Sequence, residues 1–152
     1  MKLSLRAEYA LRALISLAAS YQAGVVSIQT LSDAPQIPKR FLEQILNDLR
    51  SGGFVESKRG ISGGYRLARA ADEITVSDIL QYVEGSFGQG ADSGKRAPIP
   101  SDMDAAQFAI RGLMREAGDA AVSVLKDVTI EDLRSRAEAA RSAARLTADY
   151  MI

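Results

Sequence analysis

Apolar side chains recur in the first twenty residues with the period of an α-helix. They stand three or four positions apart, at Tyr9, Ala10, Ala13, Leu14, Leu17, Ala18 and Tyr21. This spacing predicts a helix over about residues 7–20 that ends before Gly24. Its apolar side is long enough to supply core for a small domain.

Two shorter helical patterns follow, and prolines separate them. Ser27 can cap a helix of about two turns beginning at Ile28, and Pro35 ends that helix. The next helix opens with Pro38, a residue tolerated in a first turn, and runs to the glycines at 52 and 53. The sequence therefore predicts two consecutive helices joined by a tight connection.

The second of these helices has two chemically different faces when its residues are placed 100° apart. The predicted packing face carries Phe41, Leu42, Ile45, Leu46 and Leu49. The predicted free face carries Lys39, Arg40, Glu43, Gln44 and Asn47. A short helix pair whose second helix is polar and basic on its outer side is typical of a helix-turn-helix.

A glycine-rich, basic hairpin is predicted directly after this pair. Phe54–Ser57 and Tyr65–Leu67 have the length of short strands, and residues 58–64 between them include Lys58, Arg59 and three glycines. The glycines permit positive φ angles and close approach to a surface. The two cations suit a phosphate or a narrow minor groove. A hairpin in this position is typical of the wing of a winged helix-turn-helix.

Capping patterns mark the later helices. Thr75 with Asp78 has the form of a capping box, and Gly85 ends the helix that it begins. Residues 85–100 are rich in Gly, Ser, Ala and Pro, which predicts a flexible loop.

A long helix is predicted to begin at a second cap, Ser101 with Asp104, and a last helix at a third, Thr129 with Asp132. An Ala/Arg-rich tail follows the last helix. The apolar stripe of the long helix consists of Ala105, Phe108, Ala109, Leu113, Ala117, Ala120, Ala121, Val124, Leu125 and Val128. Because this stripe is too long for a small head to cover, it favours a dimer interface over a ligand pocket.

These patterns define the expected architecture: mainly α with a small β-hairpin, as a winged helix-turn-helix head plus a long dimerisation helix. We expect the head over residues 1–84, the loop over residues 85–100, and the dimerisation and C-terminal helices over residues 101–152. A chain of 152 residues suits one compact unit with a dimerising segment.

Charge is balanced over the whole chain but not along it. The 19 basic and 19 acidic residues give a net charge of zero, which argues against a generic basic nucleic-acid-coating protein. Residues 34–70 nevertheless carry seven basic and three acidic side chains. This local excess indicates an anion-binding face.

The absence of cysteine and histidine narrows the chemistry further. It removes disulfides, thiolate nucleophiles, imidazole bases and metal sites built from nitrogen or sulfur ligands. No carboxylate pair or hydroxyl–lysine arrangement stands out, so we expect that the protein is not an enzyme. Glu8 and Arg12 interrupt what would otherwise resemble a secretion signal, and no apolar run has membrane-spanning length. We therefore expect a cytoplasmic protein.

Several short segments together resemble the Rrf-type family of bacterial winged helix-turn-helix transcription regulators. They are Lys2–Ser4 with Tyr9–Ala10, Phe41–Leu46 with Leu49, Gly53–Val55, Arg59–Leu67 and Ile74–Ile79. The resemblance is dense over residues 1–85 and continues more thinly to Val128–Leu133. The family includes iron–sulfur and nitric-oxide sensors and a repressor of cysteine metabolism.

The resemblance implies a homodimeric repressor with crossed long helices that binds a pseudo-palindromic site in double-stranded DNA. Glu43 and Gln44 would face base edges in the major groove, where a carboxylate accepts from cytosine and an amide pairs with adenine. Arg59 and Gly60 would enter the adjoining minor groove. The full set of expected DNA-contacting residues is Arg6, Ser27, Lys39, Arg40, Glu43, Gln44, Arg50, Lys58, Arg59, Gly60 and Ser62.

Two departures from the family pattern matter. Lys39 stands where relatives often carry a serine or a similar cap, which affects the expected base preference. Sensor members carry three cysteines in the segment corresponding to residues 85–104, where this chain has Ser86 and Ser93. Because serine does not replace thiolate as an iron–sulfur ligand, we expect no cluster and no other cofactor.

The input to such a cluster-free regulator would be a partner protein or a small ligand. The cysteine-metabolism repressor, which works with an enzyme of cysteine synthesis, is the family's precedent. The alternative function is a winged-helix interaction module that does not bind DNA on its own. That alternative would be indicated by loss of the basic residues from the wing and the second helix, and this sequence retains them.

Overall fold

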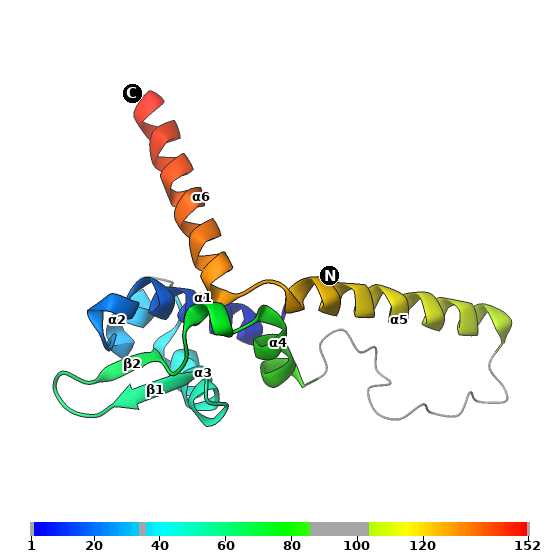
Figure 1. Ribbon diagram of the computed structural model, residues 1–152, viewed down its shortest axis with the longest axis horizontal. Helices are drawn as coiled ribbons and strands as arrows, with labels where there is room; N and C mark the ends of the chain where they lie inside the picture. Colours follow the sequence, from blue (N-terminus) through cyan, green and yellow to red (C-terminus); the bar gives the residue numbers. More distant parts are fainter. Residues whose placement is uncertain (1, 34–35, 86–103, 152) are drawn as a thin grey trace.

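The computed structural model describes residues 2–33, 36–85 and 104–151. In chain order its elements are α1 (Leu5–Ala19), η1 (Tyr21–Ala23), α2 (Ile28–Asp33), α3 (Lys39–Ser51), β1 (Val55–Lys58), β2 (Gly64–Leu67), η2 (Ala71–Glu73), α4 (Val76–Glu84), α5 (Ala105–Lys126) and α6 (Ile130–Tyr150). Figure 1 shows a head made of α1–α4 and the hairpin, from which α5 and α6 project in different directions. The predicted mainly α fold with one small hairpin is confirmed.

α1 is the centre of the head. It packs against α3, α4, α6 and β2. Its buried side chains include Leu14, which is fully inaccessible, as are Leu42 and Leu49 of α3 and Ile79 of α4. α1 begins two residues earlier than predicted because the Ser4 hydroxyl accepts from the Ala7 N–H at 3.1 Å and caps it.

The predicted packing face of α3 is correct except at its first turn. Phe41 is 46% exposed, so the prediction that it packs in the core was wrong. It lies about 90° around the helix from the centre of the buried residues, at the edge of the face that α1 covers. The Arg40 guanidinium lies 5.8 Å from the centre of the Phe41 ring.

The long helix begins later than predicted. α5 starts at Ala105, and Asp104 caps it by accepting from the Gln107 N–H at 2.8 Å. The prediction of Ser101 as the cap was therefore wrong; Ser101 itself and most of the predicted loop lie outside the described residues. α6 is longer than predicted, because the Ala/Arg-rich stretch consists of good helix formers and continues the helix to Tyr150.

A backbone junction fixes α6 to the head. Thr75 and Thr129, the N-caps of α4 and α6, form an antiparallel β-bridge, and both carry the predicted capping boxes. The Ile130 N–H donates to the Ile74 carbonyl at 2.9 Å, and both isoleucines are fully buried. α6 is thus held at its first residue, before it leaves the head (Figure 1).

α5 contains no buried residue. Its exposed large apolar side chains are Phe108, Ile110, Leu113, Met114 and Val124. Within the described ranges, no helix is both long enough and apolar enough to cross a bilayer.

Candidate nucleic-acid interface

α3 presents a continuous polar surface to solvent. Its apolar residues from Leu42 to Leu49 are held by α1, which turns the remaining side chains outward. The exposed polar residues of α3 include Lys39, Arg40, Glu43, Gln44, Asn47 and Arg50. The predicted free face is therefore exposed as a surface, with two cations in the first turn and carboxylate and amide groups in its middle.

α2 lies before α3 in the helix-turn-helix. The exposed Ser27 caps α2, because its hydroxyl accepts from the Thr30 N–H at 3.2 Å and contacts the Thr30 hydroxyl at 2.9 Å. In the connection to α3, Gln36 adopts a φ of 55°, and the Ser32 hydroxyl donates to the Ile37 carbonyl at 2.7 Å. These bonds cap the start of α2 and connect its second half to Ile37, just before α3.

The hairpin forms a short antiparallel wing. Its register pairs Val55 with Leu67 and Lys58 with Gly64. Across the two strands, the Arg66 guanidinium donates to the Glu56 carboxylate at 2.9 Å. At the tip, Gly60 has a φ of 112°, which side chains rarely adopt.

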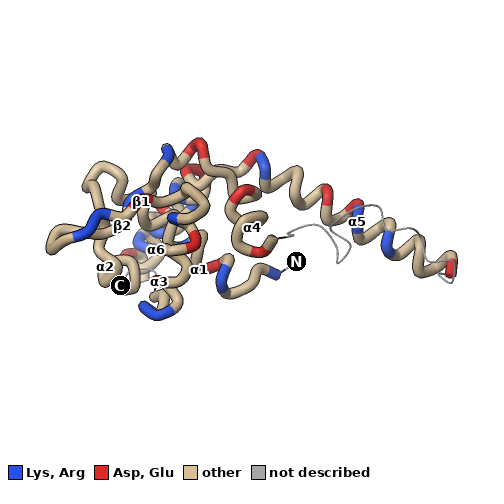
Figure 2. The backbone as a smooth tube through the Cα atoms, turned by 90° about the horizontal axis from the view of Figure 1, so that it is seen from below, with Lys and Arg blue, Asp and Glu red and all other residues tan. Residues whose placement is uncertain are grey.

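Basic residues gather at the wing tip. Figure 2 shows Lys and Arg at the outer end of the hairpin, beyond the rest of the head. Lys58, Arg59 and Ser62 are exposed there. A protruding basic tip beside an exposed polar helix can meet a polyanion at two places.

The wing is tied to the helix-turn-helix. Val26 and Tyr65 exchange two backbone hydrogen bonds of 2.8 Å. A Cβ on Gly64 would lie 2.3 Å from the Val26 carbonyl oxygen, so only glycine permits this approach. At the other side, Arg50 of α3 donates to the Ser57 hydroxyl at 3.1 Å. The wing and α3 are therefore held in one relative position.

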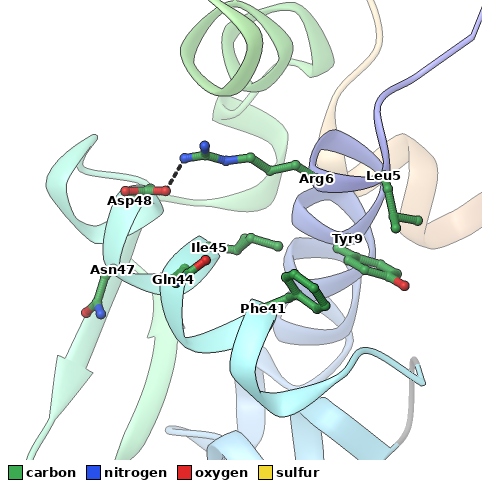
Figure 3. A pocket seen from close by; sticks show the side chains of 8 residues that line it. All are labelled: Leu5, Arg6, Tyr9, Phe41, Gln44, Ile45, Asn47 and Asp48. Carbon is green, nitrogen blue, oxygen red and sulfur yellow. Dashed lines mark hydrogen bonds and ion pairs between the residues drawn. The ribbon is translucent and has the colours of Figure 1, made fainter.

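A half-open cleft of about 640 Å³ lies between the start of α1 and α3. Figure 3 shows the side chains that line it, which are Leu5, Arg6, Tyr9, Phe41, Gln44, Ile45, Asn47 and Asp48. The Arg6 guanidinium and the Asp48 carboxylate form an ion pair that connects the two helices. Arg6 was predicted as a DNA-backbone contact, and in the structure its partner is this carboxylate.

The structure brings the predicted residues together in two groups. Those on α3 form the polar face, and Lys58, Arg59, Gly60 and Ser62 form the wing tip. Arg6 reaches the α3 group from α1, whereas Ser27 lies at the start of α2. Asp48 was missed, although its position one helical turn after Gln44 is visible in the sequence. Its partner is 42 residues away, so no local pattern could reveal the pair.

A helix-turn-helix with an exposed polar second helix and a basic wing fixed beside it defines a winged helix-turn-helix protein. The family model for Rrf2, described as an iron-dependent transcriptional regulator, matches residues 3–136. The chain belongs to the Rrf2 family. It is a DNA-binding transcription regulator of the helix-turn-helix type and not an enzyme.

Two relatives illustrate the similarity in sequence. The Mycobacterium tuberculosis protein Rv1287 is 36% identical over 155 residues, which cover 99% of this chain and 91% of that protein. The regulator CymR of Bacillus subtilis is 33% identical over 135 residues, covering 89% of this chain and 91% of CymR.

Solved structures show the same fold. The structure of CymR, described as the global cysteine regulator of B. subtilis, matches with a TM-score of 0.73 at 32% identity, over 90% of this chain and 98% of CymR. The structure of T. potens IscR matches with a TM-score of 0.74 at 26% identity, over 92% of this chain and 90% of IscR.

The family description names iron, but this chain lacks the donors for an iron–sulfur cluster. It contains no cysteine and no histidine, and carboxylate oxygens do not replace thiolates in such clusters. Across the part of the chain that the structure describes, no three Asp or Glu side chains gather in a metal-binding group. The residues present therefore do not fit the group that the sensor members hold.

Proposed function

We propose that the protein is a homodimeric repressor that binds a pseudo-palindromic operator and works without an iron–sulfur cluster. Residues 1–84 form the DNA-binding head, and residues 101–152 form the dimerisation and C-terminal helices. The observation that carries the proposal is the fixed pairing of an exposed polar α3 with a basic wing, held by the Val26–Tyr65 bridge. The protein acts in the cytoplasm, where bacterial DNA lies.

In this proposal α3 enters the major groove. Glu43 and Gln44 contact base edges, because both are exposed in the middle of the polar face. Lys39, Arg40 and Arg50 lie at the two ends of α3, where the DNA backbone passes a helix placed in the groove. Ser27 contacts the backbone from the start of α2.

The wing enters the adjoining minor groove. Arg59 supplies the cation that a narrow minor groove attracts, and Lys58 and Ser62 contact phosphates beside it. Gly60 permits close approach, because glycine has no side chain to stand between the tip and the groove and readily adopts the φ of 112° found there.

The dimer forms through α5. Five large apolar side chains are exposed on this helix, and four of them, Ile110, Leu113, Met114 and Val124, fall within about 100° of one another around the helix axis. Monomeric proteins rarely expose an apolar helix face of this kind. A second copy of the same helix would cover it, and two heads would then face two half-sites of a palindrome.

The regulatory input is a protein partner or a small ligand. A chain without cysteine has no thiolate with which to bind a cluster or to respond to oxidation. CymR, a relative described as the global cysteine regulator of B. subtilis, supports an input other than iron, because its description names cysteine. In this chain the segment around residues 85–100 is the candidate receiver; beyond Gly85, that segment lies outside the described residues.

The first experiment is selection of genomic fragments by the purified protein, followed by titration of the enriched duplex against salt concentration. We expect a palindromic motif and a steep fall of affinity with salt, because Lys and Arg displace counterions from phosphates. A scrambled duplex of the same length is the control. Absence of enrichment at low salt, with the protein folded, would favour the interaction-module function instead.

A further inference from the structure

The ion pair between Arg6 and Asp48 stands inside the proposed DNA-binding surface. Arg6 lies in the first turn of α1 and Asp48 in the second half of α3. Figure 3 shows the Arg6 side chain extended across the cleft to the Asp48 carboxylate, on the same helix as Gln44 and Asn47. The side chains are 55% and 44% exposed, so a ligand can reach both.

We propose that Asp48 competes with the DNA phosphate for Arg6 and thereby sets the affinity of the protein for its operator. The proposal rests on the function proposed above. In the free protein, Arg6 neutralises a carboxylate that would otherwise face the DNA. On binding, Arg6 must exchange that carboxylate for a phosphate, or remain paired and contribute little attraction.

The exposure of the pair makes this exchange feasible. Exposed ion pairs change an equilibrium by only about two- to fivefold, because water and salt screen both charges. A phosphate presents several oxygens to a guanidinium, which binds such groups with two parallel hydrogen bonds. Arg6 is therefore held in place, but weakly enough for a phosphate to displace Asp48.

A different role for Asp48 leads to the opposite expectation. If Asp48 served to orient Arg6 toward the phosphate, removing its charge would weaken DNA binding. If Asp48 competes, removing its charge frees one cation and removes one repulsive carboxylate. The sign of the effect of Asp48→Asn therefore separates the two roles.

The experiment compares wild-type protein, Asp48→Asn, Arg6→Gln and the double variant on the operator duplex obtained by selection. We expect Asp48→Asn to bind about two- to fivefold more tightly per protomer, or on the order of 4- to 25-fold for a dimer. The slope of log affinity against log salt should steepen by about 0.9 per protomer, since one more phosphate is neutralised.

The double variant tests whether the tighter binding of Asp48→Asn depends on Arg6. Arg6→Gln in the Asp48→Asn background should return the affinity to about the wild-type value, because it removes the cation that Asp48→Asn frees for a phosphate. The control is Glu138→Gln on α6, which removes the same charge from another exposed ion pair, with Arg134, away from the cleft. It should leave affinity and salt slope unchanged.

Equal or weaker binding by Asp48→Asn overturns the proposal, as does a double variant that binds as tightly as Asp48→Asn alone. Asn matches Asp in size, and thermal unfolding of the variants verifies the fold. If wild-type protein enriches a palindromic motif and Asp48→Asn binds it no better, only the competition fails. If wild-type protein enriches no duplex, the proposed function fails and the competition with it.

Discussion

Individual side chains on α3 and on the wing have different expected effects on DNA binding. Glu43 and Gln44 stand in the middle of the exposed face of α3, where a groove would present base edges. Arg59 stands at the wing tip, where a cation gains affinity whatever the sequence. Substitutions at the two places should therefore change different measured quantities.

Glu43→Ala should alter the base preferred at one position of each half-site. The reason is that a carboxylate accepts a hydrogen bond from the cytosine amino group and repels the acceptors of other bases. Selection with a randomised half-site would measure the preference, with discrimination at that position falling by about 1–3 kcal/mol. An unchanged preference profile would show that α3 does not read bases through this residue.

Arg59→Ala should weaken binding to all sequences alike. It removes one cation from the polyanion contact, so the salt slope should become shallower by about 0.9 per protomer. Arg145→Ala is the matched control, because it removes an exposed arginine from α6, a helix that leaves the head in a different direction from the hairpin (Figure 1). A sequence-selective loss, or an unchanged slope, would contradict the role given to the wing tip.

At the level of elements, the starts of α4 and α6 were predictable, because a cap is local, whereas the starts of α1 and α5 were misplaced. Both capping boxes, at Thr75 and Thr129, could be recognised from residues three positions apart. The polar face of α3 followed from its period. The exposure of Phe41 and the partner of Arg6 did not follow, since each depends on how α1 crosses α3. Thus the outline of the site was predictable, but the charge pairing within it was not.

The first turn of α6 has a predictable pH dependence. Hydrogen bonds from the Thr129 backbone and side chain lower the pKa of Asp132 below its ordinary value of 3.8. A hydrogen bond from Arg134 lowers the pKa of Glu131 below 4.5. Because both pKa values are lower in the folded state, the stabilisation is present above these ordinary values and is lost as the pH falls through the folded-state values.

Thr129→Ala should destabilise the protein by about 1 kcal/mol at neutral pH, since it removes the cap of α6. It should also make unfolding somewhat less dependent on pH in the acid range. The backbone hydrogen bond from residue 129, the larger cause of the lowered pKa of Asp132, remains, but the hydrogen bond from the hydroxyl is lost. Thermal unfolding from pH 3 to pH 7, in steps of about half a unit, measures both effects. If unfolding of Thr129→Ala depended on pH as steeply as that of the wild type, the Thr129 hydroxyl would not contribute to the acid dependence.

At the scale of the whole molecule, the two projecting helices decide the assembly. α5 and α6 leave the head in different directions, and α5 has no buried residue of its own. A helix that stays uncovered in one chain gains most of its stability from a partner. The proposed dimer therefore supplies the packing that the single chain lacks.

Leu113→Glu should convert the dimer into monomers. It places a charge in the centre of the exposed apolar side chains of α5, and a buried unpaired carboxylate is strongly unfavourable. Sedimentation velocity measures the mass, and operator affinity should fall on the order of 100-fold as the second half-site contact is lost.

Arg115→Glu is the matched control for this variant. It changes the charge of α5 by more than Leu113→Glu does, but about half a turn away from Leu113. It should leave the protein dimeric. A Leu113→Glu protein that remains dimeric would place the interface elsewhere.

The bridge between Thr75 and Thr129 has a consequence for how such regulators diversify. It joins the cap of α4 directly to the cap of α6, so this attachment of α6 to the head is made by residues on either side of the segment 86–103. A change in the length or sequence of the segment between Gly85 and Asp104 leaves the residues that form this attachment in place. Acquisition of a new signal is thereby separated from operator recognition, and each can evolve without retuning the other.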